Sequence, residues 1–237
     1  MKILIGIATY KRPEKLKRLL ASIASQSYTN YKVVIMFDNN DSESMYEVVK
    51  YFGFMNIDWC VRKTRGYVIG CWNDIHKIQG YDAHLMLCDD VELQEKTLET
   101  AVHALKIAGN DTVIGISQEC PGCPTYTFKP YGQTLMGKKF VESFKNVDYQ
   151  VCCPDYFHWF QDQEMYEYMG SIGKFIYCEE AVLNHYHPCF VREEMDETHN
   201  VVRGNEVSGM DKSTFEERQS RGLRWGKTFD LINKEGK

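Results

Sequence analysis

Two acidic clusters follow directly after apolar segments and carry the clearest chemistry in this sequence. Asp38 opens an Asp-Asn-Asn-Asp run after residues 31–37, and Asp89 and Asp90 follow residues 83–88. Such carboxylates can accept hydrogen bonds, bind a divalent cation or take up a proton. The structural alternatives are a solvated Asp-rich turn at Asp38 and an acid pair that caps the next helix. Their common position after apolar segments favours a ligand site.

The apolar segments alternate with helical patterns along the first half of the chain. Residues 2–8 are apolar, and the next segment repeats apolar residues with the spacing of one helix face. Further strands are expected at 31–37, 57–61, 83–88 and 112–117, with helices between them. This alternation predicts an α/β fold with a mostly parallel central sheet flanked by helices. Ligands bind at the carboxyl ends of the strands in such sheets, where both acidic clusters fall.

Composition narrows the class of protein. The chain has 237 residues, of which 43% are hydrophobic and 26% charged, a composition typical of soluble globular proteins. Its net charge of −5 supplies no overall attraction to nucleic acid or to an anionic membrane. No apolar run approaches the roughly 20 residues of a membrane span, and the 9 scattered cysteines favour reduced thiols. We therefore expect a cytoplasmic protein.

The order of several short motifs resembles glycosyltransferase family 2. The motifs are the opening Ile-Gly-Ile-Ala-Thr-Tyr-Lys-Arg-Pro at 5–13, the segment 26–38, the glycine-containing segment 66–73, the acidic strand end at 85–93, and residues 161–185. The resemblance implies the GT-A fold, a Rossmann-like nucleotide-diphospho-sugar transferase fold. It divides residues 1–192 into a nucleotide-sugar-binding half (1–118) and an acceptor-binding half (119–192). A polar C-terminal extension (193–237) follows, with an amphipathic helix near 215–225.

The resemblance implies an inverting, hexosyltransferase-like enzyme that moves a sugar from a nucleoside-diphosphate sugar to an acceptor hydroxyl. UDP is favoured as the nucleotide, because the carboxylate of Asp38 can accept the imide N–H of uracil. Arg12 can approach the phosphates. Trp72 stands where the family commonly has an arginine, so Arg65 or Lys63 would supply that charge. The expected donor-binding residues are Thr9, Tyr10, Arg12, Asp38, Arg65, Asn73 and Asp89.

The acidic strand end resembles the metal-binding Asp-x-Asp motif of the family. Hard oxygen ligands are needed to hold Mn²⁺ or Mg²⁺ across a leaving diphosphate. The resemblance assigns the metal to Asp90 and His185, with His187 as the alternative histidine. Cys88 replaces the first acid of the motif.

One acid in the second half matches the family's catalytic base. Counting back from Gly173, Asp162 occupies the position that removes the proton of the acceptor hydroxyl in inverting members. Glu164 is the alternative base. The structural alternative for Asp162 is a helix N-cap.

The acceptor is less well defined by the sequence. Aromatic residues gather between about 120 and 160 and suit a sugar ring, so we expect a saccharide or another hydroxyl-bearing acceptor. A DNA acceptor is possible but not favoured. It would use the basic residues Lys138, Lys139, Arg218, Arg221, Arg224 and Lys227. A further hypothesis is a structural zinc site formed by Cys120, Cys123, Cys152, Cys153 and His158. It is less favoured than cysteines that simply pack as thiols in an aromatic-rich region.

Two other function classes stay open. A sugar-1-phosphate nucleotidyltransferase shares the nucleotide-binding half, but residues 8–13 lack the glycine-rich phosphate loop of that class. A non-catalytic glycan- or nucleotide-binding protein on a degenerate transferase fold would account for Cys88 and Trp72. A measurement of donor hydrolysis separates this second class from an enzyme.

Overall fold

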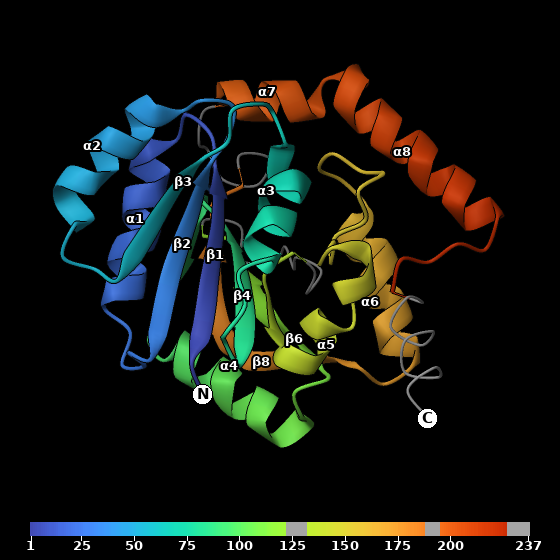
Figure 1. Ribbon diagram of the computed structural model, residues 1–237, viewed down its shortest axis with the longest axis horizontal. Helices are drawn as coiled ribbons and strands as arrows, with labels where there is room; N and C mark the ends of the chain where they lie inside the picture. Colours follow the sequence, from blue (N-terminus) through green and yellow to red (C-terminus); the bar gives the residue numbers. More distant parts are fainter. Residues whose placement is uncertain (122–131, 188–194, 227–237) are drawn as a thin grey trace.

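The computed structural model describes residues 1–121, 132–187 and 195–226 (Figure 1). The elements are, in chain order, β1 (Ile3–Thr9), α1 (Pro13–Ala24), β2 (Tyr31–Phe37), α2 (Ser42–Phe52), β3 (Ile57–Val61), α3 (Tyr67–His76), β4 (Ala83–Cys88), β5 (Val91–Leu93), α4 (Thr97–Ala108), β6 (Val113–Glu119), β7 (Thr134–Gly137), α5 (Lys138–Glu142), a 3-10 turn (Lys145–Val147), α6 (Gln161–Ser171), β8 (Phe175–His185), α7 (Glu197–Arg203) and α8 (Asn205–Ser220).

Within the described residues, the strands form one eight-stranded sheet in the order β3-β2-β1-β4-β7-β6-β8-β5. Neighbouring strands from β3 to β4 are parallel, as are β6 and β8. β7 pairs antiparallel with both β4 and β6, and β5 pairs antiparallel with β8. The predicted α/β fold with a mostly parallel sheet is confirmed.

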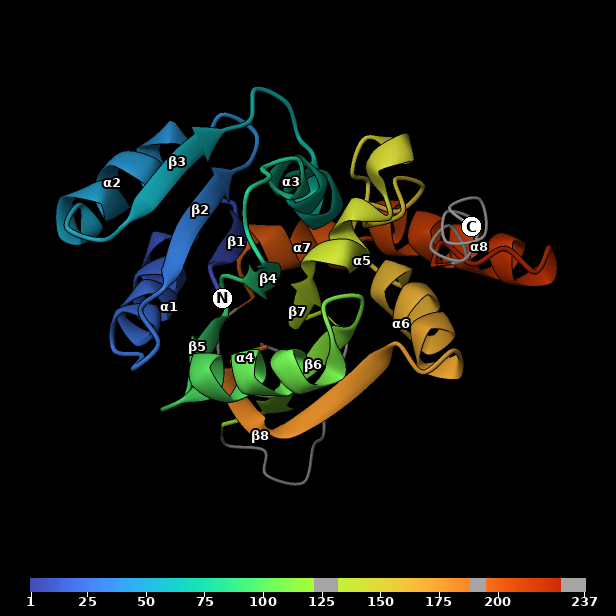
Figure 2. The same ribbon diagram turned by 60° about the horizontal axis from the view of Figure 1, so that its bottom comes forward.

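Different helices cover the two faces of the sheet (Figure 2). Ile3, Ile5 and Ile7 of β1 belong to a core cluster that includes residues of α1, α2 and α4. Leu4 belongs to a second cluster with residues of α3, α5 and α6. Because side chains alternate across a strand, β1 is buried on both faces and its sequence is continuously apolar. Gly6 lets α3 approach closely, since a Cβ there would lie 2.8 Å from Ile75 Cγ2.

The structure departs from the predicted elements in the second half of the chain. The sequence predicted an irregular region over residues 120–156, yet β7 lies there between β4 and β6. A buried four-residue strand is too short to show a period, so only its pairing with two neighbours reveals it. The helix expected near 215–225 starts earlier and ends at Ser220.

The C-terminal segment returns to the end of the sheet where β1 and β4 finish. α7 crosses above the strands in Figure 1, and α8 then runs down the side that carries α6. Thr198 Oγ1 donates a hydrogen bond to the Tyr10 carbonyl at 3.1 Å, which fastens α7 to the loop after β1. Among the residues described, no helix combines the length and the apolar character that a membrane span requires.

Candidate active site

A cavity of about 540 Å³ lies at the carboxyl ends of β1 and β4. Its walls come from the loop after β1, the start of α3, the end of β4, the start of α6 and the helix α7. The structure brings together most of the residues that the sequence singled out. The predicted residues that line the cavity are Thr9, Tyr10, Arg12, Asp38, Arg65, Asp89, Asp90, Asp162 and His185.

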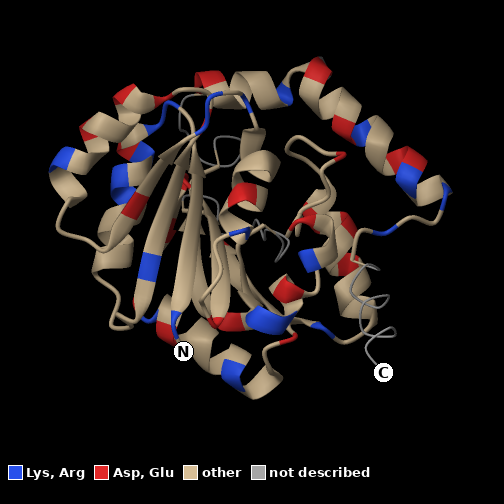
Figure 3. Ribbon diagram, in the orientation of Figure 1, with Lys and Arg blue, Asp and Glu red and all other residues tan. Residues whose placement is uncertain are grey.

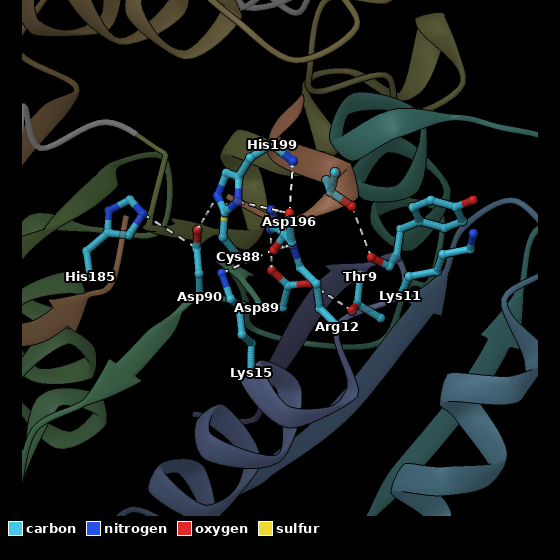
Figure 4. Close-up of polar contacts among 12 residues, drawn as sticks. Thr9, Lys11, Arg12, Lys15, Cys88, Asp89, Asp90, His185, Asp196 and His199 are labelled. Atoms are coloured by element: carbon cyan, nitrogen blue, oxygen red, sulfur yellow. Dashed lines mark hydrogen bonds and ion pairs between the residues drawn. The ribbon is translucent and has the colours of Figure 1, made fainter. Parts of the chain in front are cut away.

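Asp89 is held by two residues of the loop that follows β1 (Figure 4). Thr9 Oγ1 donates to Asp89 Oδ2 at 2.8 Å, and Arg12 Nη1 donates to Asp89 Oδ1 at 2.9 Å. Arg12 also donates from Nη2 to Asp196 Oδ1 at 2.9 Å, just before α7. Burial alone would lower the pKa of Arg12, but the carboxylates of Asp89 and Asp90 raise it, so the guanidinium stays charged. Arg12, expected near phosphate, thus joins two buried carboxylates.

Asp90 faces two imidazoles (Figure 4). Its Oδ1 lies 3.5 Å from His185 Nε2, and its Oδ2 lies 3.8 Å from His199 Nε2. The opposite ring nitrogens face acceptors, since His185 Nδ1 is 2.9 Å from Gln118 Oε1 and His199 Nδ1 is 2.9 Å from Asp196 Oδ1. A proton on each Nδ1 satisfies these contacts. Each Nε2 then either carries a second proton toward Asp90 or presents its lone pair to a bound cation.

Such an arrangement fits a bound cation. Burial opposes ionisation of Asp90, but His185, His199 and Arg12 outweigh it and hold the pKa of Asp90 well below its usual range. Asp90 Oδ1 is buried and accepts no hydrogen bond from the described residues. Acceptor atoms that face each other need a proton or a metal ion between them. Among the described residues, no three His, Cys, Asp or Glu side chains are arranged to hold a metal ion by themselves. Asp90 and an imidazole would therefore bind an ion together with oxygens of the diphosphate or of water, the ligands that Mg²⁺ and Mn²⁺ prefer.

His187, the alternative histidine, lines the cavity beside the other two imidazoles. Its ring centroid lies 5.7 Å from that of His185 and 5.6 Å from that of His199. Burial lowers the pKa of His187 to about 4, so the ring is neutral near pH 7. A neutral imidazole is the form that binds metals.

Asp38 holds the turn that starts α3. Its two carboxylate oxygens accept the backbone N–H groups of Gly66 at 2.8 Å and Tyr67 at 3.0 Å. Arg65 Nε lies 3.5 Å from Asp38 Oδ2, and the Arg65 guanidinium carbon lies 3.9 Å from the centre of the Tyr10 ring. Asp38 therefore positions a cationic and aromatic wall of the cavity in addition to lining it.

Asp162 stands in the first turn of α6 and lines the cavity. The residue that caps α6 is Phe160, at a φ of 67°, so Asp162 is not the N-cap that the structural alternative required. A Cβ on Gly132 would lie 3.7 Å from Asp162 Oδ2, so Gly132 leaves room in front of the carboxylate. Asp162 thus lies at the cavity with the helix N-terminus favouring its ionised form.

Glu164, the alternative base, has a different environment. The side chain is fully buried and pairs with Arg218 of α8, with Arg218 Nη2 at 2.9 Å from Glu164 Oε1. Tyr156 donates its hydroxyl to Glu164 Oε2 at 2.8 Å, and the Trp225 backbone N–H donates to Oε1 at 2.8 Å. Glu164 therefore joins α6 to the C-terminal segment and does not line the cavity.

Asn73, which the sequence predicted to bind the donor, does not line the cavity. Its amide donates to the Cys152 carbonyl and accepts from the Cys152 N–H, both at 2.9 Å. Asn73 thus fixes a loop behind the site. Trp72 and Gln161 do line the cavity. Trp72 Nε1 and Gln161 Oε1 are buried without a hydrogen-bond partner among the described residues.

Sequence reasoning missed Asp196 and His199. Asp196 caps α7 through the His199 backbone N–H at 2.9 Å, and its side chain also meets Arg12. The one signal in the sequence is an Asp-x-x-His spacing, which places both side chains on one helical turn. The polar composition around it gave no reason to place this turn against β1.

The less favoured predictions were a DNA acceptor and a structural zinc site, and the structure shows where several of their residues lie. Arg218 binds Glu164, Arg221 Nη1 binds Glu217 at 3.0 Å, and acidic and basic side chains are interspersed along α8 (Figure 3). Lys227 and Cys123 lie outside the described residues. Cys120 is buried, Cys152 and Cys153 are buried free thiols, and burial raises the pKa of Cys153 to about 12.

The fold and the cavity define a glycosyltransferase with the GT-A fold. The model of the family described as glycosyl transferase family 2 matches residues 4–170, and the chain belongs to this family. No curated protein sequence matches the chain.

Solved structures of TarS from S. aureus share the fold. The TarS 1-349 structure in complex with UDP has a TM-score of 0.64 and 16% identity, over 98% of this chain and 81% of that chain. The structure in complex with UDP-GlcNAc has a TM-score of 0.52 and 20% identity, over 62% and 48%. A longer TarS structure has a TM-score of 0.62 and 18% identity over 79% of this chain, which spans 37% of its length.

Proposed function

We propose that this protein is an inverting, hexosyltransferase-like enzyme that moves a sugar from a UDP-sugar to an acceptor hydroxyl with the help of Mn²⁺ or Mg²⁺. The observation that carries the proposal is one cavity with two chemically different walls. Ionised Asp90 and two imidazoles line one wall, and Asp162 lines the other. A metal-diphosphate and an acceptor hydroxyl need these two environments on opposite sides of the sugar that is transferred.

Thr9, Tyr10, Arg65 and Asp38 would hold the nucleoside. The Tyr10 ring and the Arg65 guanidinium offer flat surfaces to a base, and Asp38 is a buried acceptor beside them. The neighbouring TarS structures contain UDP and UDP-GlcNAc, which supports a uridine donor here. Asp89, fixed by Thr9 and Arg12, would contact the ribose.

Asp90 and His185 would bind the metal, with His199 as a further ligand. When bound, the ion would neutralise charge that develops on the leaving diphosphate. Gln118 and Asp196 would orient the two imidazoles through their Nδ1 atoms. Because Cys88 does not supply the first acid of the motif, histidines would replace its contribution.

Asp162 would act as the base. A single displacement inverts the anomeric carbon: the acceptor oxygen forms a bond to it as the bond to the diphosphate oxygen breaks. The acceptor proton passes to a carboxylate oxygen of Asp162. The sugar hydroxyls would meet Trp72 Nε1 and Gln161 Oε1, because a hydroxyl can accept from one and donate to the other.

The proposal also assigns different roles to different parts of the chain, and it includes a cytoplasmic location. Residues 1–118 would bind the donor and residues 119–192 a saccharide or another hydroxyl-bearing acceptor. The extension from 193 onward contributes to the site through α7. The residue set gives no reason to favour DNA as the acceptor.

Calorimetric titration tests the donor half of the proposal. UDP, UDP-GlcNAc, UDP-glucose, dTDP, GDP and CMP would be titrated with Mn²⁺ and again with EDTA, into wild-type protein and D90A. We expect binding of uridine nucleotides that needs Mn²⁺ and is lost in D90A, together with slow UDP release from the UDP-sugar. Absence of nucleotide binding under both conditions would remove the enzyme proposal. Binding without any UDP release would favour the non-catalytic alternative.

A further inference from the structure

The C-terminal helix α8 holds the wall of the cavity that carries Asp162. Asp211 of α8 is fully buried, and its carboxylate accepts three consecutive backbone N–H groups. Phe157 donates to Oδ1 at 2.9 Å, while His158 and Trp159 donate to Oδ2 at 2.8 and 2.7 Å. Among the described residues, no lysine or arginine pairs with Asp211, and these three N–H groups bind its carboxylate.

The segment 157–159, which Asp211 binds, lies directly before the helix that carries the proposed base Asp162. His158, Trp159 and Phe160 line the cavity, and α6 begins at Gln161, one residue before Asp162. Phe160 has a left-handed φ of 67°, a conformation that a bulky residue rarely adopts without support from its surroundings. The start of α6 therefore depends on contacts that hold this turn.

Further contacts tie the same turn to the C-terminal helices. The Phe160 ring stacks on Phe215 of α8, with the ring centroids 5.0 Å apart and the ring planes 23° from parallel. Trp159 Nε1 donates to the Val202 carbonyl of α7 at 2.8 Å. α8 runs along the side of the molecule that carries α6 (Figure 1). The base wall is thus braced by residues that follow the family's matched region of 4–170.

We propose that Asp211 is a positioning residue for Asp162: by holding the 157–159 backbone it fixes the left-handed turn at Phe160 and the first turn of α6. This inference rests on the proposed function, since it assigns to α8 a part in the transfer step. Asp211 does not line the cavity and touches neither donor nor acceptor. Its loss should therefore change turnover and leave donor binding almost unaltered.

The test compares D211N with V207A. D211N keeps the shape of the side chain and loses the charge and one acceptor oxygen. V207A trims a buried apolar residue of α8 and leaves the Asp211 carboxylate and its three backbone donors unchanged. UDP release from UDP-GlcNAc would be measured for kcat and KM, with thermal melting as the check on folding. We expect kcat to fall by about 10²-fold in D211N, the size of effect of a misplacement near 1 Å, with KM unchanged within about 2-fold. V207A should keep its kcat even where it melts earlier.

Hydrogen–deuterium exchange supplies a second measurement. The amides of Phe157, His158 and Trp159 should exchange at least about 10-fold faster in D211N and at the wild-type rate in V207A. A folded D211N with wild-type kcat would overturn the positioning role while leaving the proposed function intact. Equal losses of kcat in D211N and V207A would also overturn it, because they would show a general effect of α8 stability. If the wild-type protein neither binds nor cleaves UDP-sugars, the proposed function itself fails.

Discussion

The two walls of the cavity are built in opposite ways. The donor wall uses residues that stand at the ends of β1, β2 and β4, where each strand stops and a turn begins. The base wall uses a loop before α6 that is held by α7 and α8, some 50 residues further along the chain. The strand ends are positioned by the sheet, and α7 adds Asp196 and His199 to them. The base wall is a loop and a helix start, and its backbone depends on contacts from α7 and α8.

This difference separates binding from turnover. Changes at the donor wall should alter nucleotide affinity and its dependence on metal. Changes at the base wall should alter kcat while nucleotide binding persists. The following predictions test that separation. A base-wall variant that weakens nucleotide binding as much as it lowers kcat would contradict it.

The largest effect is expected for D162N. The amide keeps the size of the side chain but cannot take the acceptor proton, so kcat should fall by about 10³-fold. UDP affinity with Mn²⁺ should stay within about 2-fold of wild type. Steady-state UDP release and calorimetry measure the two quantities. A residual kcat above a tenth of the wild-type value would remove Asp162 as the base.

Glu164 should behave as a structural acid. E164A removes the buried carboxylate of the pair and leaves Arg218 with Asp155 alone, so it should lower the free energy of unfolding by about 3 kcal/mol. The folded protein that remains should keep its kcat. Urea unfolding followed by CD measures the stability. A stable E164A without activity would instead favour Glu164 as the base.

Glu164 should also make the stability of the folded protein depend on pH. Burial would raise the pKa of Glu164, but hydrogen bonds from Arg218, Tyr156 and Trp225 lower it below its ordinary value of 4.5. A lowered pKa in the folded state stabilises the protein above pH 4.5, and this contribution is lost as the pH falls through the folded value. The stability gap between wild type and E164Q should therefore be constant near pH 6 to 7 and narrow below pH 4.5. A gap that widens toward low pH would contradict the assignment.

D90N tests the donor wall. Removing the charge between His185 and His199 should abolish the Mn²⁺ dependence of UDP binding and lower kcat by about 10²-fold. D89N is the matched comparison, since Asp89 binds Thr9 and Arg12 rather than the imidazoles. Titration with and without EDTA should show metal dependence retained in D89N. Metal dependence retained in D90N would exclude Asp90 as a ligand.

The sequence predicted the strand-end residues of the site better than the residues of α7, and the reason is physical. Asp38, Asp89 and Asp90 end apolar runs whose pattern is local, so their meeting point follows from the rule for parallel sheets. His199 reaches Asp90 across more than a hundred residues, through an Asp196 cap in a polar segment without a hydrophobic period. β7 was missed for the same reason, because four residues carry no pattern until two neighbouring strands pair with them.

Asn73 shows a further limit of motif reading. The motif placed Asn73 beside the donor, but its side-chain amide binds both the carbonyl and the N–H of Cys152. The neighbouring Trp72, which the motif treats as a departure, is the residue that lines the cavity. A side chain's position within a motif therefore predicts its helix and turn more reliably than the partner it meets.

The smallest effect is expected for W72F. Phenylalanine keeps an aromatic ring in the second core cluster and removes the indole N–H, which is buried without a partner among the described residues. If that N–H donates to a sugar hydroxyl, W72F should weaken UDP-GlcNAc binding by about 5-fold, the worth of one neutral hydrogen bond, and leave UDP binding unchanged. W225F is the control, since Trp225 does not line the cavity and its indole N–H donates to the Gln150 carbonyl at 2.9 Å, so its loss should lower stability instead of donor affinity. Equal changes in UDP and UDP-GlcNAc affinity in W72F would place the sugar elsewhere in the cavity.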